Sequence, residues 1–129
     1  MARFRRTPTT PLTGLFAVAV VALGACGGGG SGGPVGAVTI TGTEMRFDPG
    51  DLTLAPGRYR FHFVNGGTTY HDLGIYQGGR ALGIRSAGAG QSIDLDVLRL
   101  TSGSYTMECH EPGHLQAGMR GTIAVRKAS

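Results

Sequence analysis

The chain has 129 residues, with 12 Lys and Arg against eight Asp and Glu, giving a formal net charge of +4. Three of the cations, Arg3, Arg5 and Arg6, lie in the first six residues, and the other nine are scattered and nearly balanced by the acids. This length fits one domain, and charges without a basic cluster give no electrostatic basis for a nucleic-acid partner.

The first 25 residues have the three parts of an export signal. Basic residues 3–6 precede an apolar run, Leu15–Leu23, which is shorter than the roughly 20 residues that a membrane-spanning helix needs. The sequence Leu23-Gly24-Ala25-Cys26 resembles the bacterial lipobox, which implies that Cys26 is diacylated and becomes the new N-terminus. The alternative is an ordinary signal cleaved near Ala25, with Cys26 left free. We expect an exported protein, lipid-anchored to the outer face of the bacterial cell membrane.

Residues 26–36 form a candidate linker that follows the signal. Its stretch from Gly27 to Gly33 is interrupted only by Ser31, and such a composition cannot bury an apolar face, so a flexible tether is expected. We therefore divide the chain into a signal peptide at 1–25, a lipidated cysteine with a glycine-rich linker at 26–36, and a folded domain at 37–129.

The folded part shows a period of two in its apolar residues, interrupted by turn sequences. This alternation predicts half-buried strands, and no segment has a sustained helical period. The turns are predicted at Asp48-Pro49-Gly50, Pro56-Gly57, Asn65-Gly66-Gly67 and Gly78-Gly79. The expected strands cover 38–41, 52–54, 58–64, 73–76, 81–85, 92–97, 104–108 and 122–125. About eight short strands in one small domain predict an all-β fold, a β-sandwich or Greek-key barrel.

A cluster of metal-ligand residue types lies near the C-terminus. Cys109, His114 and Met119 follow the spacing Cys-x4-His-x4-Met, and a strand ending at Cys109 with a Pro-Gly turn behind it would bring all three side chains together in one loop. The best candidate for a fourth ligand is His71, which precedes the expected strand 73–76 and would enter from a neighbouring loop.

The types of these donor atoms indicate the metal. A thiolate, two imidazoles and a thioether favour copper, because soft sulfur stabilises Cu(I) while the nitrogens also accept Cu(II). Zinc would also accept one Cys and two His, and Cys109 beside a histidine is a conceivable hydrolase nucleophile, although no helix is predicted to activate its thiol. Because protein ligands fill the site, we expect no enzyme activity at the metal and no small-molecule substrate.

These residues resemble the cupredoxins, the small blue copper proteins that include plastocyanin, azurin and auracyanin. The resemblance covers roughly 37–125, including FDPGDLTLAPGRYRFHFVN, HDLGI and YTMECHEPGHLQAGMRGTIAV. It implies a Greek-key β-sandwich with one type 1 copper ion, and outer-sphere electron transfer through the exposed edge of His114. We expect a monomeric one-electron carrier that serves redox partner proteins of a respiratory or other electron-transfer chain. Copper storage or delivery, and a metal-free interaction module on the same fold, are the alternatives.

Two residues depart from the pattern of that family. Asn usually follows the first histidine and a small hydroxyl residue usually follows the cysteine, and the two brace the ligand loops. Here Asp72 and His110 occupy these positions. We hypothesise that Asp72 and His110 pair in place of that brace and tune the site from its second shell of contacts.

Overall fold

The computed structural model describes residues 32–129, so the candidate signal and the candidate lipidation site, Cys26, lie outside the described residues. Within 32–129 the chain forms ten β-strands arranged in two sheets. This architecture confirms the predicted all-β sandwich. The described residues contain no helix with the length and apolar character needed to cross a membrane.

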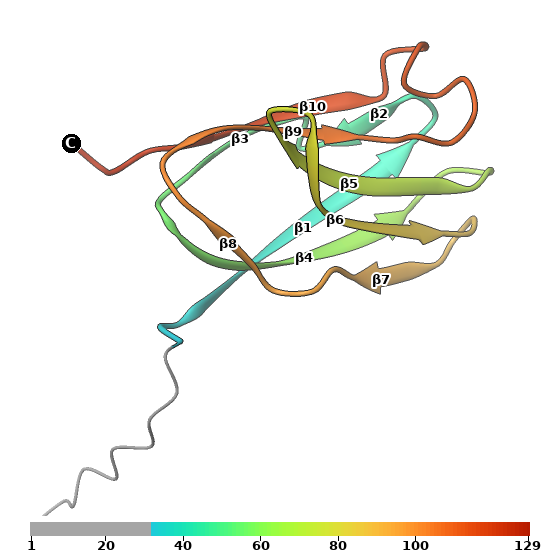
Figure 1. The fold of residues 1–129 in the computed structure, drawn as a ribbon. Coiled ribbons are helices and arrows are strands. Elements are labelled where there is room, and N and C mark those ends of the chain that lie inside the picture. Colours follow the sequence, from blue (N-terminus) through green and yellow to red (C-terminus); the bar gives the residue numbers. More distant parts are fainter. Residues whose placement is uncertain (1–31) are drawn as a thin grey trace, which may run out of the picture. The chain divides into compact units, whose positions relative to one another are not determined.

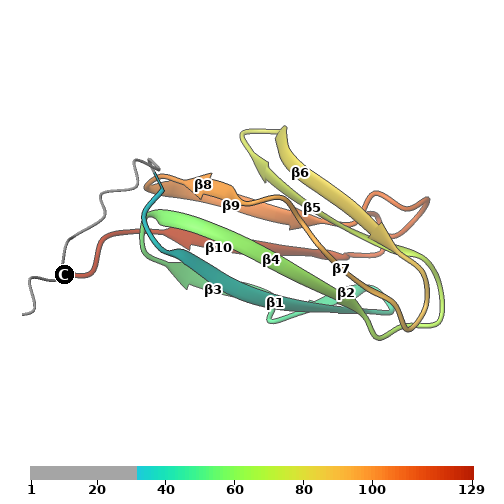
Figure 2. The same cartoon turned by 90° about the horizontal axis from the view of Figure 1, so that it is seen from below.

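The first sheet is built around a parallel pair of long strands. Its strands are β1 (Val35–Thr43), β2 (Arg46–Asp48), β4 (Gly57–Asn65), β7 (Ser92–Asp94) and β8 (Leu98–Leu100). Their order is β2-β1-β4-β7, and β8 also pairs with β4. Strands β1 and β4 run side by side in parallel from Val35 opposite Arg58 to Gly42 opposite Asn65, as Figure 2 shows.

The second sheet carries both segments that contain the expected ligands. Its strands are β3 (Asp51–Leu54), β5 (His71–Gln77), β6 (Arg80–Ala87), β9 (Gly103–Glu108) and β10 (Arg120–Val125). Their order is β3-β10-β9-β5-β6, so β5 lies next to β9. The pairing places Gly74 opposite Glu108, which brings the start of β5 close to the residue that follows β9.

The core follows from the period of two. In β4, Phe61 and Phe63 are fully buried while the side chain between them, His62, is half-buried. Full burial of a large apolar side chain contributes about 1.5–3 kcal/mol. The Tyr105 hydroxyl donates to the Thr101 carbonyl at 2.8 Å and accepts from its amide at 3.0 Å, which fixes the start of β9 as tyrosine corners do in other β-sandwiches.

Two short strands were not among those expected from the sequence. β2 and β8 have three residues each, which is too short for an alternating pattern to be recognised. β7 ends at Asp94, so the expected strand 92–97 is about half as long as predicted. β1 begins at Val35, two residues before the expected start of the domain.

The two ends of the sandwich differ in what they carry. Figures 1 and 2 show the start of β1 and the C-terminal segment at one end, and the loop between β9 and β10 at the other. Parallel and antiparallel registers also place the last residue of β4, Asn65, and the first residue of β5, His71, at this second end. We call the first the linker end and the second the loop end.

Candidate metal centre

The candidate ligands lie at strand boundaries of the loop end. His71 is the first residue of β5, Cys109 directly follows β9, and Met119 directly precedes β10. The loop 109–119 is closed by two main-chain hydrogen bonds, from Cys109 N to the Met119 carbonyl at 3.1 Å and from Met119 N to the His114 carbonyl at 3.0 Å. Gly113 and Gly118 have φ of 85° and 99°, which lets the loop turn without the strain that a side chain would cause.

The donor atoms of three candidate ligands converge. His71 Nδ1 lies 3.1 Å from His114 Nδ1, and Cys109 Sγ lies 3.5 Å from His114 Nδ1. All three residues offer a donor within 4.8 Å of one another. Taking zinc's bond lengths of about 2.0–2.1 Å to nitrogen and 2.3 Å to sulfur as a guide for first-row metals, donors of one ion are separated by at most about 4.2–4.4 Å. The two measured distances fit one small metal ion.

Burial sets the protonation of these donors. Burial raises the pKa of the Cys109 thiol and, with the neighbouring His114, lowers the pKa of His71. Without a metal the thiol is therefore a poor nucleophile and the His71 ring is neutral, with a lone pair available on one nitrogen. This argues against the hydrolase alternative, which needs an activated thiolate. Met119 is also fully buried, beside Gly42, where an added side chain would contact its terminal methyl group.

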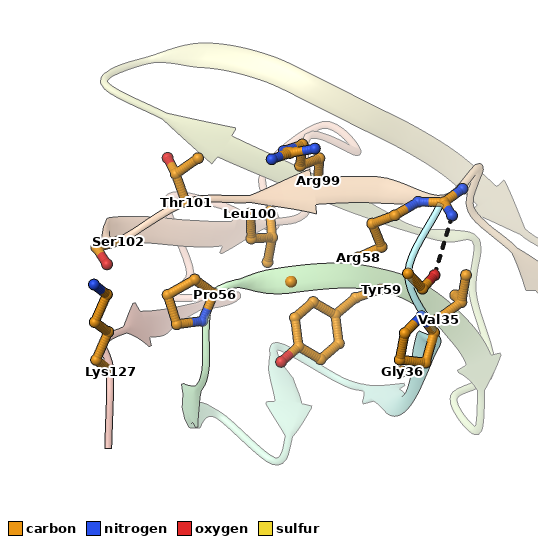
Figure 3. A pocket seen from close by; sticks show the side chains of 13 residues that line it. Val35, Gly36, Pro56, Arg58, Tyr59, Arg99, Leu100, Thr101, Ser102 and Lys127 are labelled. Carbon is orange, nitrogen blue, oxygen red and sulfur yellow. Dashed lines mark hydrogen bonds between the residues drawn. The ribbon is translucent and has the colours of Figure 1, made fainter. Parts of the chain in front are cut away.

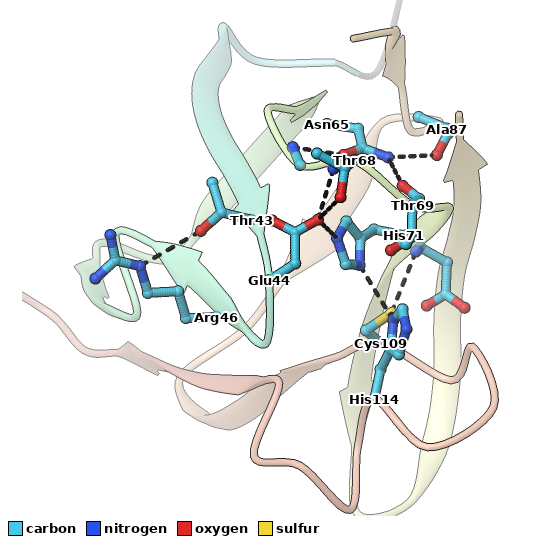
Figure 4. A network of polar contacts seen from close by, with 12 residues as sticks. Thr43, Glu44, Arg46, Asn65, Thr68, Thr69, His71, Ala87, Cys109 and His114 are labelled. Carbon is cyan, nitrogen blue, oxygen red and sulfur yellow. Dashed lines mark hydrogen bonds and ion pairs between the residues drawn. The ribbon is translucent and has the colours of Figure 1, made fainter. Parts of the chain in front are cut away.

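Glu44 lies behind His71 and was not identified from the sequence. Its carboxylate accepts hydrogen bonds from the Thr68 amide and hydroxyl, which lower the pKa of Glu44 to about 2. Glu44 Oε1 is 3.7 Å from His71 Nε2, beyond a direct hydrogen bond but close enough to favour the proton on that nitrogen (Figure 4). The Nδ1 lone pair of His71 then faces Cys109 and His114. No sequence pattern connects a turn residue with a histidine so far along the chain.

Asn65 anchors the loop that leads to His71, although the sequence marked it only as a turn residue. It is fully buried, and its side-chain amide donates to the carbonyls of Thr69 and Ala87, each at 2.8 Å. Its side-chain oxygen accepts from Gly67 N at 2.9 Å. These three bonds hold the loop 65–71 against β6 and so hold the start of β5 (Figure 4).

Asp72 and His110 meet through the main chain of His110. The Asp72 carboxylate accepts from the His110 amide at 3.0 and 3.1 Å, and the Asp72 amide donates to Cys109 Sγ at 3.4 Å. The His110 imidazole contacts Glu108 Oε2 at 2.8 Å and stacks on Tyr76, with ring centroids 5.0 Å apart. Burial raises the pKa of Asp72, while the His110 amide acts in the opposite direction. The two ligand segments are thus joined by a carboxylate-to-amide contact, without the His110 ring.

Replacing Glu44 with glutamine is expected to raise the reduction potential of the copper-loaded protein. The carboxylate favours the more positive oxidation state, and its loss should shift the potential by about 30–60 mV, which is a threefold to tenfold change in relative affinity at 59 mV per tenfold for one electron. Asp96→Asn removes the same charge from the exposed edge at Arg85, where solvent screening leaves little effect. Equal shifts in both variants, measured by redox titration, would contradict a specific role for Glu44.

Replacing Asp72 with alanine is expected to lower the free energy of unfolding by about 1–3 kcal/mol, because the His110 amide loses its acceptor. Asp72→Asn keeps an acceptor oxygen and should cost clearly less. Urea unfolding of the metal-free variants measures the difference. If alanine and asparagine destabilise the protein equally, the contact with the His110 amide contributes nothing.

The fold and the buried sulfur and imidazole cluster define a copper-binding β-sandwich protein. A family model of copper binding proteins, the plastocyanin/azurin family, matches residues 35–126, which is most of the chain. The chain belongs to this family, the cupredoxins, and copper is its metal. Residues His71, Cys109, His114 and Met119 are arranged as in a type 1 copper site.

Solved structures support the same fold. Auracyanin B is 24% identical, with a TM-score of 0.65 over 77% of this chain and 97% of that protein. Reduced auracyanin from Roseiflexus castenholzii is 19% identical, with a TM-score of 0.64 over 70% and 97%. Auracyanin A from Chloroflexus aurantiacus, described as a "blue" copper protein, is 16% identical, with a TM-score of 0.61 over 72% and 100%. At these identities the likeness shows the fold, and no curated protein matches the sequence.

Proposed function

We propose that His71, Cys109, His114 and Met119 hold one copper ion and that the protein is a membrane-tethered one-electron carrier. The observation that supports this proposal most is the convergence of Cys109 Sγ with the Nδ1 atoms of His71 and His114 in a buried site. A bound copper ion would supply a one-electron couple between Cu(I) and Cu(II).

The surrounding protein is suited to keep the ligands in place in both oxidation states. Asn65 holds the His71 segment, Asp72 links it to the segment of Cys109, and main-chain bonds close the loop 109–119. A site that changes little on gaining or losing an electron has a small reorganisation cost. His114 is half-buried, whereas the other three ligands are fully buried. Its ring edge is therefore the proposed exit for electrons.

The surface around His114 fits brief contacts with a redox partner protein. Pro112, Ala117 and Gly118 are exposed beside it and Leu115 is half-buried. A small apolar patch of this kind gives weak association and rapid release, which a carrier requires. We propose redox proteins of an electron-transfer chain as the partners of a monomeric carrier.

The tether belongs to the N-terminal segment. We propose that residues 1–25 are removed on export, that Cys26 carries the lipid and that residues 26–36 link it to the domain. The lipobox-like sequence and the glycine composition support this arrangement. The mature protein would then lie at the outer face of the cell membrane. Mass analysis of protein extracted from membranes would detect the acyl chains on Cys26, and an unmodified Cys26 would refute the tether alone.

Copper loading followed by metal analysis and a visible spectrum tests the carrier function. One copper per chain, intense blue or green absorption and a reversible one-electron titration are expected. A colourless, copper-free protein after loading would refute the proposal. Rapid surrender of copper to a competing chelator, without reversible redox behaviour, would favour copper storage or delivery instead.

A further inference from the structure

A groove lies at the linker end of the domain, far from the candidate copper site. It has a volume of about 730 Å³ and is lined by the first residues of β1, the turn before β4, β8 with the residues after it, and Lys127 (Figure 3). Val35, Pro56 and Tyr59 contribute apolar surface, and Figure 3 shows the Tyr59 ring facing the groove. The electron-carrier proposal gives this groove no role.

The charged side chains of the groove are all cationic. Arg58, Arg99 and Lys127 line it, whereas no Asp or Glu side chain does. Two further exposed cations lie next to lining residues: Arg60 follows Tyr59 in β4, and Arg126 precedes Lys127. Within residues 32–129, none of these five cations forms an ion pair with a carboxylate.

The carboxylates lie elsewhere on the domain. Glu44, Asp72 and Glu108 surround the candidate copper site, and Glu111 lies in its loop. Two more, Asp94 and Asp96, contact His62 and Arg85 along the edge of the sandwich. Although the nearly balanced composition does not reveal it, the fold gathers cations without a carboxylate partner at the linker end, whereas the loop end carries more carboxylates than cations.

We propose that the basic linker end is a docking surface for the headgroups of anionic phospholipids. Cations beside partly apolar surface complement phosphate groups above an acyl layer, and each Lys or Arg at such a surface strengthens association. This inference rests on the proposed tether. Eight residues separate Cys26 from Val35, and a glycine-rich segment of that length spans roughly 15 Å on average. The linker end is then the part of the domain nearest the membrane.

Docking in this way would orient the carrier. With the linker end against the headgroups, the loop 109–119 at the opposite end would face away from the membrane. His114 would then be presented to soluble partners or to partner domains that extend from the membrane. A tether alone would allow all orientations, whereas a charged docking surface would favour one of them.

Vesicle binding by the untethered, copper-loaded chain from residue 27 onward tests the proposal. This chain keeps every strand and the whole compact unit, residues 31–129. We expect it to sediment with vesicles that mix phosphatidylglycerol and phosphatidylcholine, but not with phosphatidylcholine alone, and to be released by salt. Absence of binding to the mixed vesicles would overturn the proposal.

Two variants with equal charge changes separate docking from general attraction. Arg99→Ser with Lys127→Ser should weaken vesicle binding by about 25-fold, since each cation at an anionic surface accounts for roughly fivefold. Arg46→Ser with Arg120→Ser removes two exposed cations near the loop end and should change binding by less than about twofold. Equal weakening in both variants would overturn the proposal, as would binding of inorganic phosphate in the groove without binding of vesicles. The copper spectrum and the acylation of Cys26 do not depend on vesicle binding, so these two measurements test the proposed function separately.

Discussion

Replacing Cys109 with serine is expected to abolish the intense visible absorption of the copper-loaded protein and to weaken copper binding by more than about 100-fold, since even residues behind the ligands change metal affinity by 10–100-fold. The thiol is fully buried and points to the two histidines, so no other sulfur of the described residues can take its place except Met119, a much weaker donor. Copper titration and the visible spectrum measure both effects.

The control for this variant is its folding without metal. Serine differs from cysteine by one atom, and its hydroxyl can accept from the Asp72 amide as the thiol does. The free energy of unfolding of the metal-free Cys109→Ser protein should therefore lie within about 1–3 kcal/mol of the wild-type value, because this is the usual cost of a buried hydroxyl. A folded variant that keeps both its colour and its copper would refute the assignment of Cys109.

Replacing Asn65 with alanine is expected to lower the free energy of unfolding by about 2–5 kcal/mol, because two carbonyls and one amide lose buried partners at the same time. The loss also releases the loop before His71, so copper affinity should fall together with stability. Urea unfolding and copper titration of the same preparation measure the two effects.

Thr69→Ala is the matched control for Asn65→Ala. Thr69 lies in the same loop, is exposed, and accepts from Asn65 through its main chain, which alanine also provides. Its substitution should change stability by no more than about 0.5 kcal/mol. If the two variants behave alike, the side chain of Asn65 does not anchor the loop.

Local sequence patterns were sufficient to place eight of the ten strands and to identify one part of the site. The alternation in β4 predicts its two faces because successive side chains of any strand point in opposite directions. Gly78 and Gly79, with φ of 57° and 79°, form the predicted turn of the β5–β6 hairpin for the same kind of local reason. Cys109, His114 and Met119 could be grouped because a single loop has to hold all three.

Long-range packing decided what the sequence by itself could not. Local spacing predicts the all-β class and the loop that contains Cys109, His114 and Met119, because residues that are close in the sequence stay close in any such fold. Only the tertiary structure places Glu44 behind His71, joins Asp72 to the amide of His110, and gathers Arg58, Arg99 and Lys127 around one groove. These contacts depend on the register of strands that are distant in the chain, and register is determined by how the two sheets bury their apolar faces against each other.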